Sequence, residues 1–158
     1  MLALWLLGNI TANSVADSVT VAKNEGLLKQ VVDLLKSKDE RLILEASFIV
    51  STLACKLVTR PEILDQLLAF DILGVLKDLI EYKGSRLIRG EVHFLSLDTL
   101  YSLMQAKKDL IFEFDYMGGF EAVEALQYSK FKEVYDKAFK IIDSFCPQND
   151  VVGNEEKK

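Results

Sequence analysis

The chain has 158 residues, half of them hydrophobic and 27% charged, which is the balance of a globular domain or a short solenoid. Its formal net charge of −5 disfavours nucleic acid as a partner and leaves room for a basic one. With only two prolines and eight glycines, it is not expected to be an all-β protein with many turns.

Apolar residues recur at helical spacing along most of the chain and predict helices with few interruptions. The pair Asn13-Ser14 suits the N-cap of a short second helix, and Gly26 is expected to break the chain after that helix. Near the end, Gly118-Gly119 is expected to form a turn. In chain order, the expected helices cover residues 2–12, 13–24, 27–36, 40–56, 86–105 and 130–145, and another begins at Pro61.

One segment of the sequence repeats. Residues 26–35 return in similar form at 71–80, about 45 residues later, and more loosely at 119–126. Periods of about 40 to 47 residues are typical of armadillo and HEAT arrays, in which each unit has two or three helices. We therefore predict an all-α, armadillo-type, right-handed superhelical solenoid of about three repeats behind one leading helix. Its expected parts are a solenoid at 1–146, made of a remnant at 1–12 and repeats at about 13–56, 58–105 and 108–146, and a disordered tail at 147–158.

No pattern in the sequence indicates catalysis or a bound cofactor. Cys55 and Cys146 each lie in an apolar helical pattern, which predicts reduced, buried thiols. His93 is the single histidine, and no cysteine or histidine lies at a metal-ligand spacing from it. We therefore expect no enzyme activity, no metal and no cofactor, although a helical enzyme with a cleft of titratable groups is the alternative.

The most informative pair of side chains is Trp5 and Asn9. Spaced four apart, they share one face of the first expected helix. The ring offers a flat apolar surface, and the amide both donates and accepts hydrogen bonds. Such a pair suits an extended peptide, whose backbone the amide would hold and whose long side chains the ring would carry. The simpler interpretation makes both of them packing residues.

Several segments together resemble importin α, the armadillo adaptor for nuclear import. Residues 5–12 are similar to that family's recurring helix in which asparagine follows tryptophan by four positions. Residues 97–105 resemble the final helix of its penultimate repeat, and residues 117–127 and 134–145 resemble its last repeat. These segments follow one another in the same order and at the same spacing as in importin α. The resemblance covers nearly the whole chain, as the last three repeats and one helix of a fourth.

The resemblance implies a groove that binds a lysine- and arginine-rich nuclear localisation signal in extended form. Trp5 and Asn9 match the motif of a repeat that contributes to the smaller, C-terminal signal site. In the next repeat, Phe48 stands where tryptophan is expected and Thr52 where asparagine is expected. Glu45 matches the family's acidic residue on the same face, where it would pair with a ligand cation. The implied peptide-binding residues are thus Trp5, Asn9, Glu45, Phe48 and Thr52, in a degraded site of weak affinity.

The resemblance also implies partners and a location. Expected partners are basic nuclear-localisation-signal cargo, an export receptor and nucleoporins, in the cytoplasm and nucleus, with neither nucleic acid nor a membrane. Importin β would bind through an N-terminal segment that this sequence lacks. The alternative is another armadillo or HEAT scaffold of signalling or the cytoskeleton, with a groove for acidic or apolar peptides. Groove charge separates the two: carboxylates beside Trp5 suit a basic ligand, and lysines suit an acidic one.

Overall fold

The computed structural model describes residues 1–147, and the disordered tail predicted from residue 147 lies almost wholly outside them. Helices make up the described part, which holds no strand. They are α1 (Leu2–Asn13), α2 (Val15–Lys23), α3 (Glu25–Leu34), α4 (Glu40–Lys56), α5 (Pro61–Leu68), α6 (Ile72–Ile80), α7 (Arg86–Ala106), α8 (Leu110–Tyr116), α9 (Gly119–Ala125), the short 3-10 helix η1 (Leu126–Tyr128) and α10 (Lys132–Phe145). None of these helices is long and apolar enough to cross a membrane.

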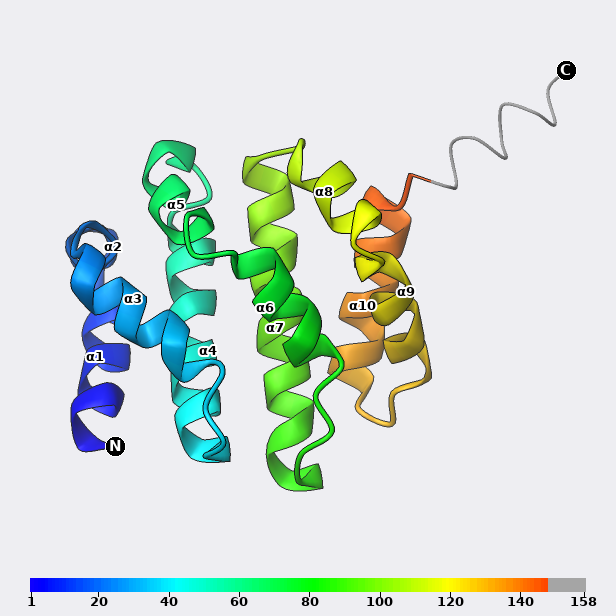
Figure 1. The fold of residues 1–158 in the computed structure, drawn as a ribbon, viewed down its shortest axis with the longest axis horizontal. Helices are drawn as coiled ribbons and strands as arrows, with labels where there is room; N and C mark the ends of the chain where they lie inside the picture. The colour runs from blue at the N-terminus through cyan, green and yellow to red at the C-terminus, as the bar shows by residue number, and fades with distance from the viewer. Residues whose placement is uncertain (148–158) are drawn as a thin grey trace, which may run out of the picture.

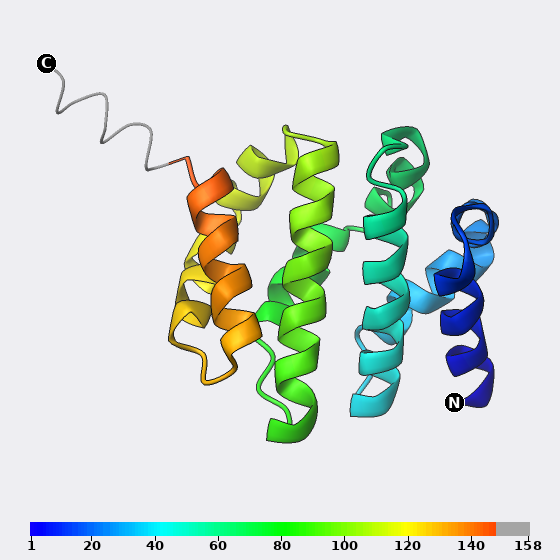
Figure 2. The same ribbon diagram turned by 180° about the vertical axis from the view of Figure 1, so that it is seen from behind.

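After α1, the helices follow one another in three triplets, α2–α4, α5–α7 and α8–α10. The last helix of each triplet lies beside that of the next, so that α1, α4, α7 and α10 form a row, seen from its own side in Figure 2. Helices α3, α6 and α9 cover the other side of this row, as Figure 1 shows for α3 and α6 in front of α4 and α7. The result is a rod of stacked triplets in two layers.

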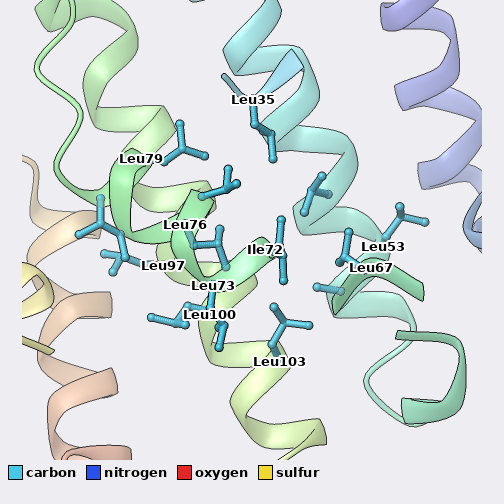
Figure 3. Packing of buried hydrophobic residues seen from close by; sticks show 14 of the residues in the cluster. Leu35, Leu53, Leu67, Ile72, Leu73, Leu76, Leu79, Leu97, Leu100 and Leu103 are labelled. Atoms are coloured by element: carbon cyan, nitrogen blue, oxygen red, sulfur yellow. The ribbon is translucent and has the colours of Figure 1, made fainter. Parts of the chain in front are cut away.

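The core lies between the two layers. Figure 3 shows apolar side chains of α4, α6 and α7 pointing into this space, with their neighbours from α3 and α5. Almost all of their surface is buried, and burying one such side chain contributes about 1.5–3 kcal/mol. The labelled members are Leu35, Leu53, Leu67, Ile72, Leu73, Leu76, Leu79, Leu97, Leu100 and Leu103.

Capping side chains explain where several helices begin. Ser14 Oγ accepts a hydrogen bond from the Asp17 backbone N–H at 3.0 Å, which confirms the predicted N-cap of α2. The predicted break at Gly26 is wrong, because Gly26 lies inside α3. Asn24 interrupts the chain instead: its Oδ1 accepts from the Leu27 N–H at 3.1 Å and starts α3 there.

The predicted turn near residue 118 is present. Gly118 has a φ of 78°, in the left-handed region that favours glycine, and the next residue already begins α9. The two cysteines differ from the prediction and from each other. Cys146 is buried as expected, whereas Cys55 is exposed, although its thiol is partly shielded by Asp98 and Ser102 of α7.

Candidate peptide-binding groove

Four of the five predicted peptide-binding residues line one cavity of about 830 Å³. Helix α1 contributes Trp5 and Asn9, and α4 contributes Glu45 and Phe48. The remaining wall comes from Leu44 of α4, from α7, and from the start of α10 and the residues before it. These wall residues are Leu44, Leu87, Gly90, Glu91, Phe94, Leu95, Lys130, Phe131, Lys132, Glu133 and Val134. We call this cavity the groove.

The rings of the groove are open to solvent. Trp5 is 53% exposed and Phe48 is 38% exposed, so neither is a core residue. Gly8 is buried and lets Phe48 approach α1, since a Cβ added there would stand 3.3 Å from Phe48 Cδ1. Asn9 is also exposed, on the same helix face as Trp5. Neither Trp5 nor Asn9 is therefore part of the core.

The acidic side chains of the groove have no ion-pair partner among residues 1–147. Glu45, Glu91 and Glu133 line it from three different helices, and none takes part in a salt bridge there. Two lysines stand at the α10 end, and one of them, Lys132, is already paired with Asp136 at 2.5 Å. The carboxylates nearest the exposed rings are therefore available to a cation.

Thr52 does not join this group. It is half-buried and outside the lining of the groove, and its Oγ1 donates to the Phe48 backbone carbonyl at 2.8 Å. A hydroxyl engaged within its own helix has less capacity for a peptide backbone than the exposed amide of Asn9. The sequence had placed both in one binding motif, and the structure separates them.

A contact that recurs between neighbouring helices shows which positions are equivalent. Gly8 of α1 lies against Phe48 of α4, Ser51 of α4 bonds Asp98 of α7, and Tyr101 of α7 packs against Lys137 of α10. Ser51 lies three residues, about one turn, after Phe48, and Tyr101 lies three residues after Asp98. Gly8 lies three residues after Trp5 in the same way. The equivalent residues are Trp5, Phe48, Asp98 and Lys137, and each stands eight residues before its helix ends. We call them the rung residues.

The third and fourth rung residues, Asp98 and Lys137, were not predicted from the sequence. Asp98 takes the place of an aromatic ring, and Lys137 follows it in the next helix. Both could have been found from their position eight residues before the end of their helix, but the helix ends are known only from the structure. Glu91 and Phe94 of the groove were also not predicted; they lie in the first half of α7, the longest helix of the described part.

The carboxylate of Asp98, the third rung residue, is already bonded by other side chains of the same chain. Asp98 Oδ1 lies 2.9 Å from Lys137 Nζ, and Oδ2 accepts from Ser51 Oγ and Cys55 Sγ at 3.1 Å each. Burial opposes the ionisation of Asp98, but Lys137 and the other donors outweigh it and lower the pKa of this carboxyl. For Cys55, burial of the thiol raises the pKa, and the carboxylate beside it adds to that shift.

A second cavity of about 610 Å³ is lined partly by α7, and its lining holds four cationic residues beside two carboxylates, Glu81 and Glu121. Its cationic residues are Lys83, Arg86, Arg89 and Lys130. His93 also lines it, with Nε2 2.8 Å from the Tyr82 carbonyl oxygen, and burial lowers the pKa of this imidazole. The arginines of this region thus lie outside the groove.

One family model matches the chain. It describes an atypical Arm repeat and covers residues 109–158, which include α8, α9 and α10. No curated protein sequence matches the chain. With the three triplets and the row of helices, this match confirms the predicted all-α solenoid of armadillo type.

Proposed function

We propose that this armadillo-repeat protein binds lysine- and arginine-rich peptide segments in the groove beside Trp5. The ligand would lie extended across α1 and α4, and its end would reach Glu91 of α7. Its long side chains would lie along the exposed rings, and Asn9 would hydrogen-bond its backbone. The interaction involves no catalysis: the protein would act as an adaptor that holds another protein.

The observation that carries this proposal is the position of free carboxylates beside exposed rings. Glu45 and Glu91 line the same cavity as Trp5 and Phe48 and have no ion-pair partner in the described part of the chain. A lysine stem packed on a ring places its ammonium group beside such a carboxylate. Attraction to a ring contributes about 0.5–1 kcal/mol at exposed sites, and an exposed ion pair about 0.2–1 kcal/mol.

Groove charge also bears on the alternative, a scaffold for acidic peptides. Such a scaffold would need lysines around Trp5 and Phe48. The basic residues of α7 instead line the second cavity, and the two groove lysines stand at the far end, beside α10. A basic ligand is therefore the better match to the charges nearest the rings.

The finer proposal is that the ligand is a nuclear localisation signal and the chain forms the C-terminal repeats of an importin-α-like adaptor. It is supported by the resemblance of several segments to that family and by a groove suited to basic side chains. Binding to an export receptor or nucleoporins and a place in both cytoplasm and nucleus belong to this proposal. They follow from the resemblance alone, and we assign no residues to them.

Trp5 is the single tryptophan, so its fluorescence reports directly on the groove. We would titrate the protein with a lysine-rich peptide and with its glutamine-substituted counterpart. The double variant Glu45→Gln/Glu91→Gln should weaken binding about tenfold, since two ion pairs are lost. The matched control Glu113→Gln/Glu124→Gln removes the same charge at exposed sites outside the groove and should bind as the wild type does. Equal affinity for both peptides would refute the proposal.

A second experiment tests the adaptor role. Protein immobilised on a support is incubated with nuclear extract, and bound transport receptors are identified by mass spectrometry. We expect import and export factors to be recovered, with basic cargo lost in the Trp5→Ala/Asn9→Ala variant. If basic peptides bind in the titration but no transport receptor is recovered, the nuclear adaptor is excluded and a different basic-peptide scaffold remains.

A further inference from the structure

We propose that Lys137, which lies outside the groove but on the same row of helices, takes the place of a ligand lysine at Asp98 and so limits the length of ligand that can bind along this row. This inference rests on the proposed function, because it concerns the same row of helices. It assigns to Lys137, a residue of the chain's own last helix, the role of setting specificity.

The environment of Lys137 is the one that the proposed ligand would need. Its Nζ lies 2.9 Å from Asp98 Oδ1 and 4.8 Å from the centroid of the Tyr101 ring. Lys140 Nζ lies over the same ring, 4.6 Å from its centroid. A carboxylate and an aromatic face together are the combination that Glu45 and Phe48 offer on α4. At Asp98 and Tyr101, the chain's own Lys137 already occupies the place that a ligand lysine would take.

The pair is also better shielded than the other ion pairs of the described residues. The side chains of Lys137 and Asp98 are 17% and 24% exposed, whereas those of the i,i+4 pair Lys132–Asp136 are 85% and 52% exposed. The second carboxylate oxygen of Asp98 is satisfied by Ser51 and Cys55. A ligand lysine would have to displace Lys137 and would gain only the contacts that Lys137 loses. No net affinity follows from reaching this site.

Length sets the expected consequence. Packed helices lie about 8–10 Å apart, and an extended peptide advances about 3.3 Å per residue, so each rung residue corresponds to about three ligand residues. The open rung residues, Trp5 and Phe48, then serve a ligand of about six residues. Further lysines, extending the ligand toward Asp98, should leave the affinity unchanged.

The test compares lysine-rich peptides of about six residues with peptides of about ten residues. The longer peptides carry their extra residues at either end, as lysine or as glutamine, because the direction of binding is open. Trp5 fluorescence measures each affinity. In the wild type, lysine-extended and glutamine-extended peptides should bind equally, within about twofold. In Lys137→Gln, one lysine-extended peptide should bind about fivefold or more tighter than its glutamine counterpart. Lys29→Gln, which removes a cation from an exposed ion pair outside the groove, should behave as the wild type does.

Each result has one meaning. A lysine-dependent gain already present in the wild type overturns the inference, and this measurement needs no variant. Absence of the gain in Lys137→Gln, or in Lys137→Met if the first variant does not fold, also overturns it, provided that the short peptide still binds. If no peptide changes the fluorescence of any variant, the proposed function itself fails.

Discussion

The same substitution, glycine to alanine, should have opposite effects on stability at two helix starts. Gly119 is the first residue of α9 and is buried. A Cβ built there would stand less than 3.0 Å from the ring of Phe114, a distance that real Cβ atoms almost never show. Gly26, in the first turn of α3, is exposed, and the nearest atom to a Cβ built there is Asn24 Oδ1 at 3.8 Å.

The magnitude at Gly119 follows from the surroundings of the Phe114 ring. Phe114 is fully buried and packs edge-on against Phe120, with ring centroids 5.3 Å apart and planes at 84°. The ring cannot retreat without disturbing this contact, and overpacking of this kind costs about 1–3 kcal/mol. Alanine recovers about 0.5–1 kcal/mol of helix propensity. We expect Gly119→Ala to lower the free energy of unfolding by about 1–2 kcal/mol.

Gly26→Ala meets no such obstacle, and its propensity gain should raise the free energy of unfolding by about 0.5–1 kcal/mol. Urea denaturation followed by far-ultraviolet circular dichroism measures both variants against the wild type. Hydrogen exchange then shows whether the loss in Gly119→Ala lies in α8 and α9. Equal shifts of the same sign would refute the reasoning, because they would mean that space around the added methyl group does not decide the outcome.

Three further predictions concern single side chains. Burial, together with Glu40, raises the pKa of Tyr82 to about 12, above the ordinary 10.0. Between pH 10 and 12, unfolding therefore releases the phenol proton, so the free energy of unfolding should fall as the pH rises through this range. Tyr82→Phe should remove that part of the loss. The Ser47 hydroxyl is buried with no hydrogen-bond partner in the described residues, so Ser47→Ala should raise the free energy of unfolding by about 1 kcal/mol in chemical denaturation. Because the pKa of Cys55 is raised, iodoacetamide should alkylate it more slowly than a free cysteine at neutral pH, and Asp98→Asn should speed the reaction.

Local signals made most of the helices predictable. The helix predicted at about 40–56 from the spacing of its apolar residues is present as α4 (Glu40–Lys56). Its start is fixed by Asp39, which accepts hydrogen bonds from the N–H groups of Arg41 and Leu42. Pro61 stands in the first turn of α5 as expected. The error at Gly26 came from weighing glycine above the capping amide of Asn24. In the structure, the side-chain cap determined the boundary.

The groove was partly predictable, for a reason of geometry. Trp5 and Asn9 share a helix face through their spacing alone, and Glu45 and Phe48 do the same. Which faces meet across the row depends on how the helices pack, and no local pattern contains that. The contact between Asp98 and Lys137 joins α7 to α10, and it was missed for this reason.

The four rung residues differ in a way that separates binding from stability along the rod. Trp5 and Phe48 are partly open to solvent and take part in no ion pair between helices of the described residues, so changes there should alter ligand affinity more than folding. Asp98 and Lys137 join α7 to α10 through a shielded ion pair, so changes there should lower stability. If Lys137 excludes ligand from its site, then Lys137→Gln must lower the free energy of unfolding and raise the affinity for longer basic peptides at once. A packing residue without that role would change the first quantity alone, so measuring both on one variant distinguishes the two.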